Sequence, residues 1–482
     1  MSYIQGENRN QMMLAPICLD DYVDTNNMCR VISAFIDGLD MTGLGFKYAE
    51  TKMAGRHPYD PAQMLKLYIY GYLNRVRSSR RLEQETHRNI EVMWLMDQLT
   101  PDDKTICNFR KDNAVALKQV FRWFSIWCNN QGLFGKELVA VDGSKFRANN
   151  SWKNIYTLES TKKLMEKVDA KIAKYIDELE KNDLVDEEKV DSAAIAEALK
   201  RLDKKKDELR LLLAELEKGE VTEISTVDPD ARIMRQGGDG RPRDACYNVR
   251  TVTDSKNGLI VDFENSICAN DIGSLSRPVI SAMEIMEVSE ITTVADSGFF
   301  DGKDFKCCAE NGITCYVAKL KRGTRAPSED YANSKFKYIK TVDAYMCPQG
   351  ELLPYKYNKK NNAPSDRIYG NIKACKACSK RDMCTSNKRG WREIHRSPYQ
   401  DYDDEMSAKM SGALGRRMMA ARRNIVEHPY GTVKQIWGFK SFLCRSLEKT
   451  SSESALAFLA YNLRRVFNIF KNDNKDLLSA MT

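Results

Sequence analysis

Two short runs of apolar and β-branched residues each end in an aspartate, Asp142 or Asp296, and a glycine follows each aspartate within two residues. Such runs predict buried strands that turn directly after the carboxylate. A strand that ends in a carboxylate suits metal binding, because the sheet fixes where the oxygens point. The alternative is ordinary strand termination. Lys145 and Arg147 follow the first aspartate and are either solvated strand-edge charges or, if Asp142 binds metal, phosphate ligands.

Residues 1 to about 135 have the apolar spacing of short helices. Asp60, Pro61 and Gln63 predict a helix start with an N-cap, a proline at N1 and a capping box. A second helix start is predicted at residues 100–103. Arginines gather where these helices meet: Arg75, Arg77, Arg80, Arg81 and Arg88. The segment is either a helix-turn-helix-like DNA-binding module or a helical packing domain with a solvated basic face.

Residues 158–217 change to two apolar stripes at helical spacing, separated by a polar stretch. They predict an antiparallel helical hairpin that is structural or faces DNA, and no chemistry is assigned to it. From residue 246 the pattern gives two hairpin-linked strands, a helix, the strand before Asp296, a helix and a last strand near 314–318. With the strand before Asp142, this order predicts a mixed α/β sheet of the ribonuclease-H-like kind, provided that the hairpin is an insertion.

Residues 320–400 are rich in Lys, Asn, Pro and Tyr, and we expect them to be irregular. They contain four cysteines: Cys347, Cys375, Cys378 and Cys384. The Cys375-x-x-Cys378 pair could chelate a metal, and the other two could complete a tetrahedral thiolate site. These residues are therefore candidates for one structural Zn²⁺, with reduced, metal-free thiols as the alternative.

Composition narrows the class of protein. The chain has 482 residues, 29% of them charged, and a net charge of +8, which favours an anionic partner. The N-terminus lacks a basic segment followed by an apolar one, and no run approaches the length of a membrane span. We therefore expect no membrane partner, a cytoplasmic location, and 14 cysteines that are thiols, metal ligands or core residues.

Residues 405–449 carry many Lys and Arg but few acidic residues, and one of these few is Glu427. Within a basic helix, Glu427 could be an i, i+4 partner of Arg423. It could also be a metal ligand flanked by cations that bind phosphate. The segment after 451 predicts an amphipathic helix that closes the core.

Together, Asp142, Asp296 and Glu427 with their surroundings resemble the DDE transposases of bacterial insertion sequences. Arg423-x₃-Glu427-x₆-Lys434 matches three of the four positions of the family's tyrosine-arginine-glutamate-lysine signature, and Ala420 stands where the tyrosine would be. The residues around the three carboxylates also resemble the family, and so do the helical N-terminal part and the cysteine-rich insertion. The resemblance extends over nearly the whole chain.

The resemblance implies a ribonuclease-H-like fold in which Asp142, Asp296 and Glu427 bind two Mg²⁺ (or Mn²⁺) ions. It implies cleavage of double-stranded DNA at terminal inverted repeats and strand transfer into target DNA, by a homodimer on DNA in a bacterial cytoplasm. The alternatives are an inactive or domesticated DNA-binding relative and a ribonuclease-H-like nuclease without strand transfer. The residues expected to bind DNA phosphates are Arg423, Lys434, Lys145, Arg147, Arg77, Arg80 and Arg81.

These expectations divide the chain into segments. They are a helical DNA-binding domain at 1–135, the first part of the catalytic core at 136–157, the helical-hairpin insertion at 158–230, the continued core at 231–320, the cysteine-rich insertion at 321–400, and the C-terminal helices of the core at 401–482.

Overall fold

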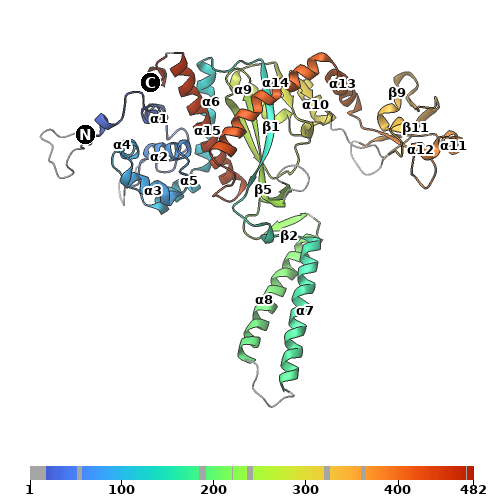
Figure 1. Ribbon diagram of the computed structural model, residues 1–482, viewed down its shortest axis with the longest axis horizontal. Helices are drawn as coiled ribbons and strands as arrows, with labels where there is room; N and C mark the ends of the chain where they lie inside the picture. Colours follow the sequence, from blue (N-terminus) through green and yellow to red (C-terminus); the bar gives the residue numbers. More distant parts are fainter. Residues whose placement is uncertain are drawn as a thin grey trace, which may run out of the picture.

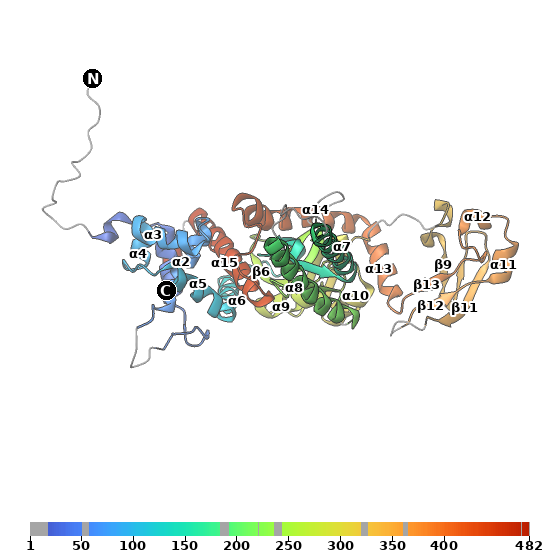
Figure 2. The same cartoon turned by 90° about the horizontal axis from the view of Figure 1, so that it is seen from below.

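The protein was analysed as a computed structural model, which describes residues 18–50, 57–183, 192–219, 221–235, 243–319, 326–359, 365–473 and 475–481. A central α/β core has a helical domain at one end and a small β-rich unit at the other (Figures 1 and 2). A long helical hairpin projects from the core at a steep angle to this axis (Figure 1). Among the described residues, no helix has the length and apolar character needed to cross a membrane.

The core is built on a six-stranded sheet in the order β4-β5-β1-β7-β8, with β6 also paired to β5. The strands are β1 (Leu138–Arg147), β4 (Arg232–Arg235), β5 (Arg243–Asp254), β6 (Ile260–Ser266), β7 (Ile291–Ala295) and β8 (Ile313–Val317). β5 is antiparallel to both β1 and β6, whereas β1, β7 and β8 are parallel. The predicted α/β fold class with a mixed, ribonuclease-H-like sheet is confirmed.

Helices pack on both faces of this sheet. On one face, Ile425 and Val426 of α14 (Ala413–Tyr430) pack against Ala140, Val294 and Tyr316. The intervening strand residues face the main core, which they share with α9 (Ser276–Met286) and α10 (Gly302–Glu310). The sheet therefore has two apolar faces, and α14 forms the cover over the ends of β1 and β7.

The N-terminal domain is helical as predicted. Its elements are η1 (Leu19–Tyr22), α1 (Met28–Asp37), α2 (Pro61–Leu73), α3 (Ser79–Arg88), α4 (Ile90–Leu95), α5 (Asp103–Asp112) and α6 (Ala114–Asn130). Asp60 caps α2 by accepting from the Ala62 amide, and Pro61 occupies N1. The predicted capping box is wrong, because the Gln63 amide donates to Asp97 and its oxygen has no partner.

The predicted hairpin is confirmed as α7 (Leu158–Asp183) and α8 (Ser192–Glu217), each 26 residues long. A two-stranded sheet of β2 (Ile155–Thr157) and β3 (Glu223–Ser225) closes its base, beside the short helix η2 (Trp152–Asn154). Most of the predicted polar link falls on residues 184–191, outside the described residues. The hairpin is inserted after the first strand of the core, as expected.

The C-terminal part runs from the β-rich unit back to the core. It contains α13 (Gln400–Ser411), α14, the π-helical turn η7 (Gly431–Ile436), α15 (Leu447–Asn472) and α16 (Leu477–Met481). The expected closing helix is confirmed, and it starts earlier than predicted. α15 packs against both α2 and α6, so it joins the N-terminal domain to the core (Figure 1).

The expectation that residues 320–400 are irregular is wrong for much of this segment. A five-stranded antiparallel sheet has the order β13-β12-β11-β10-β9. Its strands are β9 (Lys337–Ile339), β10 (Ala344–Met346), β11 (Leu352–Asn358), β12 (Arg367–Tyr369) and β13 (Ile394–Arg396). Five short helices accompany them in the described part of this unit: η4 (Glu329–Tyr331), η5 (Asn333–Lys335), η6 (Lys340–Val342), α11 (Ile372–Ala377) and α12 (Arg381–Cys384). The short helix η3 (Ser297–Phe299) belongs to the core and follows Asp296. Four of these strands have only three residues, which is too short for a period-2 pattern to show.

Candidate active site

Asp142 and Asp296 lie at the same level on neighbouring strands. β1 and β7 are parallel, and Val141 is paired with Ala295, so Asp142 within β1 lies level with Asp296, which follows β7 directly. The predicted turn directly after Asp142 is wrong, because β1 continues to Arg147 and stays paired with β5. Both carboxylates approach one nitrogen of Arg422. Its Nη2 is 2.7 Å from Oδ1 of Asp142 and 3.9 Å from Oδ2 of Asp296. Two strands that were predicted separately therefore deliver their carboxylates to one place.

Arg422 reaches this place because of the way in which α14 packs on the sheet. It precedes the buried Val426 by four residues, so both side chains are on the sheet-facing side of the helix. Its side chain is 14% exposed, whereas Arg423 is exposed. Sequence reasoning chose Arg423 and missed Arg422. The i, i+4 spacing of Arg422, Val426 and Tyr430 was the available signal.

The electrostatics of the site favour a cation between the two carboxylates. Burial raises the pKa of Asp142 to about 6, while the nearby Arg422 guanidinium lowers it and the Asp296 carboxylate raises it further. Two acidic groups on adjacent strands repel each other unless a positive charge lies between them. The guanidinium supplies that charge in this structure. Hard carboxylate oxygens are also the ligands that Mg²⁺ and Mn²⁺ prefer, so the pair fits a divalent cation.

Glu427 follows Val426 on α14, and its side chain is exposed. The helix turns by about 100° per residue, which directs Glu427 away from the apolar contact with the sheet. Its carboxylate forms no hydrogen bond or ion pair with the described residues. In the part of the chain that the structure describes, no three His, Cys, Asp or Glu side chains are close enough to hold a metal ion. The structure thus brings Asp142 and Asp296 together and leaves Glu427 on the adjacent helix.

Two side chains of the C-terminal segment tether β1 beside Asp142. The Tyr430 hydroxyl lies 3.3 Å from the Asp142 carbonyl oxygen and 2.7 Å from that of Val249. The Lys434 amine donates to the Ser144 hydroxyl at 2.9 Å and to the Lys145 carbonyl. Lys434 lies in the π-helical turn η7 rather than in a regular α-helix, which changes its angular position relative to Glu427.

Strand alternation places Lys145 and Arg147 on the face of β1 opposite Asp142. Lys145 lies 3.8 Å from Asp271, and Arg147 forms an ion pair with Asp244 at 2.8 Å. The Asp271 carboxylate also accepts from Arg250 Nε at 2.8 Å. A Cβ atom at Gly143 would lie 3.0 Å from the same carboxylate, so a larger residue there would require the Asp271 side chain to shift.

The predicted DNA-binding arginines of the N-terminal domain have different surroundings. Arg77 donates to the Ser441 carbonyl at 2.9 Å and lies over the Phe439 ring, so it contributes to the domain interface. Arg80 is exposed and pairs with Asp103 at 3.3 Å. Arg81 is also exposed. The latter two can reach an external phosphate without leaving a buried contact.

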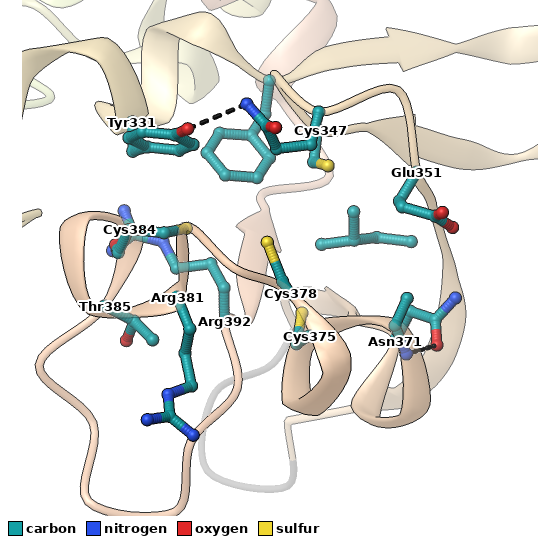
Figure 3. Close-up of a pocket in the computed structure, with 14 residues that line it drawn as sticks. Tyr331, Cys347, Glu351, Asn371, Cys375, Cys378, Arg381, Cys384, Thr385 and Arg392 are labelled. Atoms are coloured by element: carbon teal, nitrogen blue, oxygen red, sulfur yellow. Dashed lines mark hydrogen bonds between the residues drawn. The ribbon is translucent and has the colours of Figure 1, made fainter.

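The four cysteines of the β-rich unit lie around one cavity of about 40 Å³ (Figure 3). Cys347 follows β10, Cys375 is on α11, Cys378 follows α11, and Cys384 ends α12. Cysteines from three separate stretches of this unit therefore line one cavity, but no three of the described thiols are close enough together to hold a metal ion as they stand.

Comparison with known proteins gives two matches. Residues 17–112 match the family described as "Transposase domain (DUF772)", and residues 346–467 match the "Transposase DDE domain" family. No curated protein and no solved structure matches the chain. The second match includes Glu427, while Asp142 and Asp296 lie between the two matched segments. The chain thus contains two segments that are similar to transposase families, one over the helical N-terminal domain and one that runs from the β-rich unit to α15.

Proposed function

We propose that the protein cleaves DNA at the ends of a mobile element and joins the freed 3′ ends to target DNA. The observation that carries this proposal is the meeting of Asp142, within β1, and Asp296, directly after the parallel β7, next to the helix that bears Glu427. The ribonuclease-H-like sheet and the two transposase matches support it.

We assign Asp142, Asp296 and Glu427 as ligands of two Mg²⁺ or Mn²⁺ ions. When bound, such ions activate a water or a 3′-hydroxyl and stabilise the leaving oxygen of the phosphodiester. The chain contributes the fixed positions of the carboxylates. Asp142 and Asp296 are held by the sheet, and α14 is held on the sheet by Ile425 and Val426.

The cations near the site are proposed to bind DNA. Arg423 is exposed beside Glu427 on α14 and is available to a phosphate. Arg80 and Arg81 are exposed on the N-terminal domain and are proposed to contact the DNA backbone away from the cleavage site. Four other predicted phosphate ligands already have partners within the protein: Lys434, Lys145, Arg147 and Arg77. To bind a phosphate, each must share its side chain between that partner and the DNA or give up the partner. We propose that the protein binds double-stranded DNA, namely the terminal inverted repeats of the element and the target DNA. We also propose that it binds them as a homodimer.

The test measures binding and strand cleavage separately on DNA from the borders of the gene. Asp142→Asn, Asp296→Asn and Glu427→Gln should each reduce Mg²⁺-dependent nicking by more than about 100-fold, because each removes a negatively charged ligand. Binding of the element end in a mobility-shift assay should persist. Glu405→Gln, on the neighbouring α13, is the matched control and should nick at the wild-type rate. Full nicking by one of the three variants would overturn the assignment of that residue.

The same assay separates the alternatives. A DNA-binding relative without catalysis would bind the ends and leave them intact in Mg²⁺ and in Mn²⁺. A nuclease without strand transfer would nick the ends but fail to join pre-cut ends to a target plasmid. Joining of pre-cut ends by the wild-type protein, and its loss in Asp142→Asn, is the result that the proposal requires.

A further inference from the structure

The β-rich unit around β9 to β13 has a very small core. Five buried side chains form its own hydrophobic cluster, separate from the main core: Phe336, Tyr345, Leu353, Tyr369 and Ile394. A unit of this size seldom buries enough apolar surface to hold its own fold, and a disulfide or a metal commonly compensates. None of its four cysteines is in a disulfide. The unit therefore lacks a visible cross-link.

These cysteines are brought together by local structure. Cys347 begins a tight turn in which its carbonyl accepts from the Gly350 amide at 2.9 Å and its amide donates to the Glu351 carbonyl at 2.9 Å. Gly350 has φ +83°, a conformation that side chains disfavour. The turn presents the Cys347 side chain towards α11, where Cys375 and Cys378 point back to it (Figure 3). Cys384 approaches the same cavity from the neighbouring α12 (Figure 3).

The backbone near Cys378 also contacts its sulfur. The Lys380 amide donates to the Cys378 sulfur at 3.4 Å, a contact of the kind that orients a metal-ligating side chain.

We propose that Cys347, Cys375, Cys378 and Cys384 bind one structural Zn²⁺. Four thiolates from two turns and two short helices match the closed tetrahedral sites in which zinc stabilises a small fold. The four cysteines line one small cavity of about 40 Å³, which has room for a single ion. In the arrangement described here no three of the thiols are at coordinating distance. Rotation of the cysteine side chains about χ1, without a change of fold, is therefore the movement that binding requires.

The site would act on the fold of this unit and not on DNA chemistry. Arg396 of β13 ties the unit to α13 through Asp401 at 2.5 Å and Asp404 at 3.5 Å, and α13 leads into α14. A zinc-stabilised sheet would thus fix the position of the start of α13, which leads into α14 with Arg422 and Glu427. The inference stands independently of the proposed function, because a zinc site can exist in a protein that cleaves nothing.

The experiment uses the full chain, purified without a chelator or a metal-affinity step. Elemental analysis should find about one zinc per chain, and Co²⁺ exchange should give the sulfur-to-cobalt absorption and visible bands of a tetrahedral thiolate site. Less than about 0.2 zinc per chain after refolding with Zn²⁺, or iron with a visible chromophore, would overturn the proposal.

Variants locate the site. Cys347→Ser and Cys378→Ser should each lose the bound zinc, whereas Cys268→Ser and Cys307→Ser, which alter thiols outside the unit, should keep it. If the first two variants fail to fold, cleavage of the wild-type protein by a protease provides the second measurement. A chelator should expose residues 326–396 to cleavage while the ribonuclease-H-like core stays resistant. Zinc retained by both Cys347→Ser and Cys378→Ser would contradict the assignment.

Discussion

Glu453 of α15 joins the N-terminal helical domain to the catalytic core and provides a sharp test of this interface. Its side chain is fully buried and accepts four hydrogen bonds. Two come from the N-terminal domain, from Arg110 at 3.0 Å and from the Tyr72 hydroxyl at 3.2 Å. Two come from the backbone after η7, from the amides of Leu443 at 2.7 Å and Cys444 at 3.3 Å.

Glu453→Ala removes the acceptor and leaves the Arg110 guanidinium, which is 5% exposed, without its partner in the interior. Breaking a buried ion pair on one side costs about 3–5 kcal/mol, because the remaining charge is desolvated and uncompensated. In a domain of 150–250 residues, each kcal/mol lowers Tm by about 2–4 °C. We therefore expect Tm to fall by about 6–20 °C when it is followed by circular dichroism.

Two further variants show whether the loss comes from the unpaired charge. Glu448→Ala, on the same helix but exposed, is the control and should change the free energy of unfolding by less than about 0.5 kcal/mol. The double variant Arg110→Met with Glu453→Leu removes both charges and should recover most of the stability, since apolar residues of similar size replace a buried pair at little cost. If Glu453→Ala costs under about 1 kcal/mol, or if the double variant is no more stable than the single one, the reasoning is refuted.

Three further predictions concern the candidate active site, the Lys434 tether and the proposed DNA-binding surface of the N-terminal domain. Arg422→Gln removes the cation between Asp142 and Asp296, so in EDTA the free energy of unfolding should fall by about 1.5–3 kcal/mol. Added Mg²⁺ should restore it, as followed by thermal denaturation, and a variant as stable as wild type in EDTA would contradict this role of Arg422. Lys434→Met should lower the free energy of unfolding by about 1–3 kcal/mol, because the amine bonds to β1. The exposed Arg81→Gln should instead leave stability unchanged and reduce the slope of log K against log salt by about 0.9. If Lys434→Met instead lowered the salt slope and Arg81→Gln lowered stability, the structural role of Lys434 and the DNA-binding role of Arg81 would both be contradicted.

Local signals along the chain were sufficient for many elements. An aspartate followed by proline predicts the start of α2, because the N-cap and N1 positions are satisfied by groups close in sequence. The heptad-like stripes predict α7 and α8, because their apolar contacts recur at a fixed spacing. The apolar runs before Asp142 and Asp296 predict buried strand residues correctly, although β1 continues past Asp142 to Arg147 because it pairs there with the distant β5.

Local signals failed where the structure depends on residues distant in sequence. Gln63 donates to Asp97, in the turn after α4, so its sequence position near the N-cap was misleading. The three-residue strands of the β-rich unit carry no period of their own and are held by their neighbours in the sheet. The side of α14 that faces the sheet was also undetermined until the packing of Val426 selected Arg422 instead of Arg423.

The sequence by itself determined most of the helices, the succession of the main core strands along the chain and the residues able to do chemistry. Only the tertiary structure decided that Asp142 and Asp296 share one guanidinium, that Lys434 bonds to β1, and that Glu453 joins two domains. The physical reason is that helix and strand signals arise from contacts within a few residues. Pairing of strands and burial of charges depend instead on contacts between groups that are distant along the chain.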